Sequence, residues 1–228
     1  MEFQIKDSEP ISEVSAFSRV KKFHEVLPSW ISNTIEDNEK IQSIADKSFK
    51  HPNGFVKLVI EDNGTERIRL HLWTSEFDSK APSNPDIHDH RWSFVSIPLF
   101  GDFEEIKFRE SEDHEITDNS DFKYKYHCYS RGASEWLHLE ELNKVALLQF
   151  GKTSKFKAEP YFCKAGEIHT LRPLKYPAAT IVITYGAERE YARIFKDEYH
   201  GDLEMDIHAP NLTTTDVKNY LTYILNNY

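Results

Sequence analysis

From Phe55 onwards, apolar residues recur at every second position in short runs that polar turns separate. Two of these runs, FVKLVI and RIRLHLW, flank an Asp-Asn-Gly turn at 62–64, and Asn-Gly between alternating runs is a strong hairpin signal. Later runs, each of about five to eight residues, include WSFVSIPLF, FKYKYHCYS and AATIVITYG. This repeated alternation predicts a mainly β fold, either an antiparallel barrel or a double-sheet jelly roll, over residues 54–200.

The N-terminal segment has a different period, and we expect residues 1–50 to be helical. Apolar residues at three-residue steps predict a first helix: Val14, Phe17, Val20, Phe23 and Val26. We expect Pro28 to end or kink that helix, because proline lacks the N–H that a helix interior needs. A second short helix is predicted over 36–48.

A third helix is predicted at the other end of the chain, over 213–228, with Thr214 or Thr215 as its N-cap. The charged segment 109–121 is typical of a loop at a hairpin tip. Of the 228 residues, 39% are hydrophobic and 13% aromatic, which is enough for a sizeable core. Since no stretch resembles a linker, we predict one domain over 1–228.

Charge and cysteine content limit the partners and the compartment. The formal net charge is −10, which disfavours non-specific binding to nucleic acid or to anionic membranes. We find no apolar run of about 18 residues, as a spanning helix needs, and the first ten residues do not resemble a secretory signal. Cys128 and Cys163 are too few for a disulfide framework. These features predict a cytoplasmic protein with reduced thiols.

Two histidine motifs carry the main functional signal: IHDH at 87–90 and GEIH at 166–169. In a strand, side chains repeat every second residue, so His88 and His90 lie on one face. A third imidazole from His169 would complete a three-nitrogen clamp for a metal ion. Imidazole suits Zn, Cu, Fe and Ni, and three protein ligands leave positions open for a substrate or O₂.

Both motifs resemble the two sequence motifs of the cupin superfamily, whose members fold as jelly-roll barrels. The first cupin motif has an H-x-H, a carboxylate a few residues later and a Gly after the strand; here it reads HDHRWSFVSIPLFG. The second is G-x-x-H, here GEIH. The usual carboxylate is missing, because positions 93–95 hold Ser93, Phe94 and Val95. The resemblance therefore implies a site of three histidines without a glutamate ligand.

Within the cupins, this pattern is similar to that of the cysteine dioxygenase-like thiol dioxygenases. The resemblance implies Fe(II), with Zn, Mn or Ni as alternatives, and O₂ together with a small anionic substrate, in particular a thiol that is oxidised to a sulfinate. It also implies a catalytic tyrosine on the strand after the third histidine, where Tyr185 falls. Val95 stands where some members have a cysteine crosslinked to that tyrosine, so no crosslink is expected. The family's carboxylate-binding arginine has no clear counterpart; Lys57, Arg67 and Arg69 are the candidates.

Several further residues have a pocket role and a structural role as competing interpretations. His71 is in phase with Arg69 and Trp73, so it either lines the pocket or fills the strand's inner face. Trp92 is in phase with the H-x-H histidines and is expected to wall the pocket. Arg172 either supplies positive charge to an anionic substrate or is a solvated turn residue.

Three neighbours of the histidines are expected outside the coordination sphere. Asp89 points away from the metal in a regular strand, which favours a supporting or turn role. Glu167 lies one position out of a possible fourth-ligand slot. Cys163 is expected to be a buried thiol without a redox role.

Two other functions fit the same motifs. One is a metal-binding cupin with isomerase or lyase chemistry on a sugar or acid. The other is a ligand-binding module without catalysis. A purely structural interpretation also exists, in which the histidines only fill a barrel interior. The oligomeric state stays open.

Overall fold

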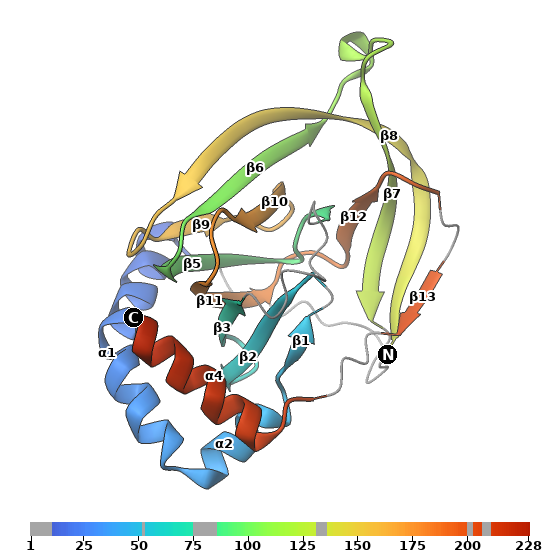
Figure 1. Ribbon diagram of the computed structural model, residues 1–228. Helices are drawn as coiled ribbons and strands as arrows, with labels where there is room; N and C mark the ends of the chain where they lie inside the picture. The colour runs from blue at the N-terminus through green and yellow to red at the C-terminus, as the bar shows by residue number, and fades with distance from the viewer. Residues whose placement is uncertain (1–10, 52, 75–85, 131–135, 200–202, 207–210) are drawn as a thin grey trace.

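The alternating runs form the strands of two antiparallel sheets (Figure 1), in a computed structural model that describes residues 11–51, 53–74, 86–130, 136–199, 203–206 and 211–228. The first sheet has the order β1-β2-β3-β11-β5-β9 and the second β13-β8-β6-β10-β4-β12-β7. The predicted mainly β class is confirmed, and two such sheets are consistent with a jelly roll. The strands of the first sheet are β1 (Phe49–His51), β2 (Phe55–Asp62), β3 (Arg67–Trp73), β5 (Trp92–Phe100), β9 (Tyr161–Cys163) and β11 (Ala178–Ala187). Those of the second are β4 (Ile87–His88), β6 (Phe103–Glu110), β7 (Asp121–Ser130), β8 (Trp136–Lys155), β10 (Ile168–Pro173), β12 (Ala192–Lys196) and β13 (Leu203–Asp206).

The long strand β8 joins the two ends of the second sheet. Its first half pairs with β7 and its second half with β6, so β8 arches over the other strands in Figure 1. The connection between β6 and β7 holds a 3-10 turn, η1 (Asp113–Glu115), and an ion pair between Arg109 and Glu115 ties this turn to β6. A loop does connect the strands here, as predicted, but it is not the tip of a hairpin, because β6 and β7 each pair with β8 and not with each other.

Three helices, α1 (Glu13–Ile35), α2 (Asn38–Ala45) and α4 (Thr214–Asn227), cover the outer face of the first sheet (Figure 1). Their apolar faces share one core with every second residue of the strands beneath them. In β3 the alternation sends Ile68, Leu70 and Leu72 towards the helices, whereas Trp73 contacts Phe103 of the second sheet. We call the space between the two sheets the barrel interior. It receives the residues of β3 that are in phase with Trp73.

The N-terminal helix runs through Pro28 to Ile35, so of the two predicted effects of Pro28, the end of the helix there is wrong. Proline removes the N–H that would bond the carbonyl of His24 four residues earlier. The hydroxyl of Tyr228 donates to that carbonyl at 2.7 Å and takes the place of the missing donor. A contact from the end of the chain therefore supports the helix at its weakest point.

Helix boundaries differ from the sequence expectations in two further places. The helical part of the N-terminal segment ends at Ala45, and Phe49–His51 form β1 instead. The N-cap of α4 is Thr213, neither Thr214 nor Thr215. Thr213 and Asp216 bond each other's backbone N–H in a capping box, which fixes the start of the helix there. Among the described residues, no helix is long and apolar enough to cross a membrane.

Candidate metal centre

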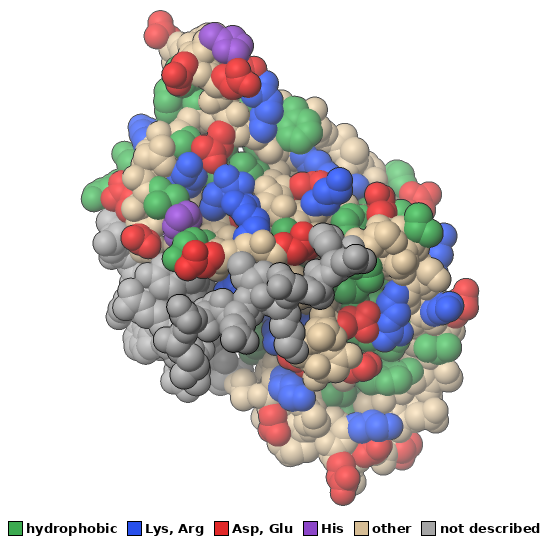
Figure 2. All heavy atoms as spheres, turned by 180° about the vertical axis from the view of Figure 1, so that it is seen from behind, with side chains coloured by type: hydrophobic (Ala, Val, Ile, Leu, Met, Phe, Trp, Pro, Cys, Tyr) green, Lys and Arg blue, Asp and Glu red, His purple; other side chains and the backbone are tan. Residues whose placement is uncertain are grey.

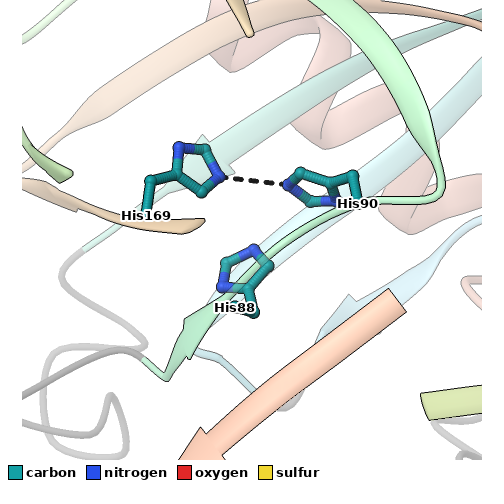
Figure 3. A group of neighbouring side chains, drawn as sticks. All are labelled: His88, His90 and His169. Atoms are coloured by element: carbon teal, nitrogen blue, oxygen red, sulfur yellow. Dashed lines mark hydrogen bonds between the residues drawn. The ribbon is translucent and has the colours of Figure 1, made fainter. Parts of the chain in front are cut away.

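The three histidines of the two sequence motifs lie together in the barrel interior. Strand β10 runs antiparallel to β4, and this pairing puts His169 directly opposite His88. His90 follows just beyond the end of β4. Figure 3 shows the three rings converging on one point, and their candidate ligand atoms all lie within 4.8 Å of one another.

The geometry of this group fits a metal ion. The Nε2 atoms of His90 and His169 are 3.2 Å apart. For metal–nitrogen bonds of about 2.1 Å, that separation corresponds to an angle of about 100° at the metal, close to tetrahedral or octahedral values. Within the described part of the chain, only these three side chains form such a group. Three neutral nitrogen donors suit Fe, Zn, Ni or Cu and leave positions open.

Two of the three rings are held by acceptors on their Nδ1 side. Nδ1 of His88 donates to the backbone carbonyl of Asp86 at 2.8 Å, and Nδ1 of His169 lies 3.0 Å from the Glu105 carboxylate. A proton on Nδ1 leaves the lone pair on Nε2, which is the atom that faces the centre. The partners of these rings thus select the tautomer that binds metal.

Burial keeps two of the rings, those of His88 and His90, in the neutral form. Burial, followed by the proximity of His169, lowers the pKa of His88 to about 4. Burial also holds the pKa of His90 well below its usual range. Although burial alone would raise the pKa of Glu105, its bonds with His169 and Lys155 lower it to about 2. Neutral imidazole is the form that ligates metals, so the site favours binding near neutral pH.

The loop that carries His90 is fixed from behind by Asp89. This carboxylate is fully buried and pairs with Arg189 at 2.8 Å and with Arg193 at 2.6 Å. It therefore points away from the histidines, in the supporting role that was expected. Gly166 completes the arrangement, because its N–H donates to the carbonyl of His90 at 3.0 Å and so links the two motifs.

Aromatic side chains wall one side of the centre. Trp92 stacks beside His90 with ring centroids 6.0 Å apart, and Phe94 meets the same ring edge-on at 5.1 Å. Trp92 therefore lies beside one of the three histidines. The guanidinium of Arg69 lies 5.7 Å from the centroid of the Trp92 ring, and its Nη2 donates to Thr184 at 2.7 Å.

Two cations in the barrel interior have no ion-pair partner among the described residues. Arg69 is 5% exposed, and neither it nor Lys57 on the neighbouring strand forms an ion pair with a described carboxylate. Burial lowers the pKa of Arg69 to about 9, and burial together with the charge of Arg69 lowers the pKa of Lys57 further below its usual value. Both cations also lower the pKa of His90, so they act on the metal centre.

Two buried polar atoms lie beside these cations. Nε of Arg69 and Nε2 of His71 lack a hydrogen-bond partner among the residues that the structure describes. His71 packs against Phe55 with ring centroids 4.7 Å apart, on the strand pair that carries Lys57. By contrast, acidic and basic side chains are interspersed over the outer face shown in Figure 2. The interior thus has a polar, cationic wall that an anionic ligand would complement.

Two predicted site residues lie elsewhere. Tyr185 packs on the helix side of β11, in phase with Ile181 and Ile183, so the expectation that it reaches the metal face is corrected. Arg172 pairs with Glu104 at 2.6 Å and is 41% exposed in its side chain. Its side chain lies on the same face of β10 as Ile168, and His169 is on the opposite face. Arg172 therefore points away from the three histidines.

Other candidates are also placed. Arg67 pairs with Asp62 at 2.6 Å beside the hairpin turn, which leaves Lys57 and Arg69 as the interior cations. Glu167 pairs with Lys107 at 2.8 Å and is not part of the three-histidine group. The Cys163 thiol lies 4.0 Å from Nδ1 of His169, and burial raises its pKa.

Sequence reasoning missed Glu105. Its signal was the pair Glu104-Glu105 in the alternating run DFEEIKF, since alternation must send one of two adjacent carboxylates inward. Glu105 is 1% exposed. A carboxylate buried to this degree usually has a cationic or metal-supporting partner.

No family model matches the chain, and neither does any curated protein. Among solved structures, the chain is similar to hydroquinone 1,2-dioxygenase from Sphingomonas sp. TTNP3 with 4-hydroxybenzoate bound, at 11% identity and a TM-score of 0.33. The likeness covers 57% of this chain and 64% of that structure. At so low an identity and TM-score, the functional inference depends on the side chains of the site and not on this structural similarity.

Proposed function

We propose that this chain is a mononuclear non-haem Fe(II) dioxygenase that oxidises a small anionic substrate, in particular a thiol to its sulfinate. His88, His90 and His169 would hold the ion through Nε2. Bound Fe(II) would supply redox chemistry and open positions for O₂ and substrate. The overall reaction would be RS⁻ + O₂ → RSO₂⁻, in which both oxygen atoms go to sulfur.

The observation that carries the proposal is the combination of three neutral ligands with two interior cations that no described carboxylate pairs with. Because no carboxylate belongs to the ligand group, a divalent ion keeps its formal charge of +2 and favours an anionic ligand such as a thiolate. Lys57 and Arg69 would hold the substrate's carboxylate at the other end. Two anchors at a fixed separation would orient a short mercapto acid.

The aromatic wall supports the same substrate size and class. Trp92 and Phe94 lie against His90 and present apolar surface beside the open side of the ligand group. This surface would exclude water from the sulfur and contact a short carbon chain. A bulky or cationic substrate would lose these contacts or meet the positive charge of Arg69.

Oxygen uptake tests the proposal directly. Anaerobically iron-loaded protein is mixed with cysteine, 3-mercaptopropionate or cysteamine, and sulfinate formation is measured together with O₂ consumption. We expect kcat/KM to be highest for a thiol with a carboxylate and lowest for cysteamine, which lacks one. No O₂ uptake with any of the three thiols would overturn the thiol version.

A second candidate is a cupin with isomerase or lyase chemistry on a small acid. It is favoured by the ligand chemistry alone, since three imidazoles also suit Zn and Ni. Metal analysis of freshly purified protein separates the two. Zn or Ni at one equivalent, with activity that needs no O₂, would establish the second candidate.

A further inference from the structure

Glu105 contacts a histidine of the proposed metal centre, and the role inferred for it depends on that centre. Glu105 lies on β6 and enters the barrel interior beside β10, opposite Leu171 in register. Its Oε1 is 3.0 Å from Nδ1 of His169, and its Oε2 is 2.9 Å from Nζ of Lys155. The side chain is 1% exposed. Both carboxylate oxygens are thus engaged by named partners.

A buried ion pair of this kind contributes little to stability. Removing two charges from water costs several kcal/mol per ion, and their attraction often does no more than offset that cost. An apolar pair of similar volume would fill the same space. The position of Glu105 therefore points to a role that needs a carboxylate at Nδ1 of His169.

That role follows from the chemistry of imidazole. Accepting the Nδ1–H bond fixes the proton on Nδ1, leaves the lone pair on Nε2 and prevents rotation of the ring. A carboxylate acceptor also makes the ring a stronger donor than a neutral acceptor does. His88 has a backbone carbonyl in the same place, so the charged acceptor acts on His169.

We propose that Glu105 is a positioning residue that orients His169 and strengthens its bond to the metal, and that Lys155 holds Glu105 in place. The chain thus replaces the carboxylate ligand missing from positions 93–95 with a carboxylate that acts through a histidine. The centre keeps a neutral ligand set, while one of its ligands gains donor strength.

The adjacent residue supplies a matched control. Glu104 lies on the same strand with the opposite parity, and its carboxylate pairs with Lys152 at 2.7 Å and with Arg172 at 2.6 Å. Both glutamates are mostly buried and both contact two cationic or histidine partners. Only Glu105 contacts a histidine of the metal group.

The experiment compares metal affinity in the full chain for Glu105→Gln, Glu105→Ala and Glu104→Gln. Co(II) is the probe, titrated by its visible absorption, and Zn(II) competition gives a second dissociation constant. We expect Glu105→Gln to weaken binding by about 10-fold, because its amide still accepts the bond, and Glu105→Ala by up to about 100-fold. Glu104→Gln should bind as the unmodified chain does, and the Co(II) bands should shift only in the Glu105 variants.

Thermal unfolding and circular dichroism of the metal-free variants identify any loss of folding. If Glu105→Ala is unfolded, the metal affinity of Glu105→Gln alone tests the positioning role. Equal affinity in Glu105→Gln and the unmodified chain would overturn the positioning role, as would equal weakening in Glu104→Gln. If the unmodified chain binds neither ion, the metal centre itself is wrong. Metal binding without O₂ uptake would overturn only the proposed dioxygenase activity. The comparison of the two glutamates would remain valid.

Discussion

His88 and His169 lie directly opposite each other on the antiparallel strands β4 and β10. Opposed residues in such a pair have Cα atoms about 4.5–5.5 Å apart, and the two ring centroids are 5.2 Å apart. Backbone register therefore sets the spacing of two of the three ligands. His90 joins them from the loop that Asp89 anchors through two arginines.

Replacing a ligand histidine should abolish tight metal binding. We expect His169→Ala to weaken Co(II) affinity by on the order of 100-fold or more, because loss of a supporting partner alone costs about 10- to 100-fold. His114→Ala is the control, since that side chain is 76% exposed on η1. Calorimetric titration measures both variants. A His169→Ala chain that still binds one Co(II) tightly would place the site elsewhere.

Removing an interior cation should affect substrates according to their charge. In Lys57→Met, we expect KM for 3-mercaptopropionate to rise by about 10- to 100-fold, as the loss of a charged hydrogen bond of roughly 1.5–3 kcal/mol predicts. KM for cysteamine should not rise. Arg67→Gln is the control, because Arg67 pairs with Asp62 outside the interior. Equal effects on both substrates would mean that Lys57 does not contact the carboxylate.

These cations show what alternation can and cannot predict. The alternating patterns of the two strands predict which face Lys57 and Arg69 lie on, and in the structure both side chains do lie on the face towards the barrel interior. The residues opposite them on the neighbouring strand cannot be predicted from the alternation, because a bulge near Glu61 shifts the register of the hairpin. A two-residue Asn-Gly turn in the sequence contains no signal for that shift. In the same way, which of Glu104 and Glu105 faces His169 depends on a pairing with β10 that is non-local.

Tyr185 illustrates a different limit. Strand β11 is buried on both faces, because helices cover one and the second sheet the other. Hydrophobicity then carries no information about which face is inside. The strand and its length were predictable from AATIVITYG, but the direction of Tyr185 was not. Arg172 could have been placed correctly, since its parity is opposite to that of His169.

Gly166 should be far less tolerant of a side chain than Gly64. Both have positive φ, +81° and +85°. A Cβ at Gly166 would lie 2.3 Å from Nη1 of Arg189, whereas nothing lies within 4 Å of one at Gly64. Arg189 would have to leave Asp89, its ion-pair partner.

We expect Gly64→Ala to lower the free energy of unfolding by about 1 kcal/mol, from backbone strain alone. Gly166→Ala should lower it by roughly 2–4 kcal/mol and weaken metal binding as well, since it disturbs the loop of His90. Urea denaturation and Co(II) titration measure the two effects. Equal destabilisation by both substitutions would show that Arg189 moves aside at no cost.

Acid should destabilise the fold in part through His51. Burial, followed by the charge of Lys57, lowers the pKa of this ring to about 3, against about 6.5 in an unfolded chain. Above pH 6.5 the ring is neutral in both states. Between pH 6.5 and 3 only the unfolded state takes up the proton, so the free energy of unfolding falls as the pH falls. At pH 5 the loss is roughly 2 kcal/mol.

His51→Phe should remove this dependence and keep the stacking on Phe55, whose ring centroid is 4.4 Å away. We expect a smaller difference in urea midpoint between pH 7 and pH 5 than in the unmodified chain. His114→Phe, at an exposed position, should leave the difference unchanged. If His51→Phe retains the full difference, the proton uptake belongs to other buried histidines.

Tyr185→Phe tests whether Tyr185 is catalytic, as the resemblance to thiol dioxygenases implies, or lies away from the metal group, as the fold indicates. The hydroxyl is buried on the helix side and has no hydrogen-bond partner in the described part of the chain. Its loss removes an unsatisfied polar atom and should raise the free energy of unfolding by less than about 1 kcal/mol. Because the ring lies on the opposite face of β11 from the metal group, kcat and KM for thiols should stay within about twofold of the unmodified chain. A catalytic hydroxyl would instead contribute about 10²–10⁴-fold. Single-turnover O₂ uptake measures the difference, and a loss of that size would show that Tyr185 reaches the reacting atoms after all.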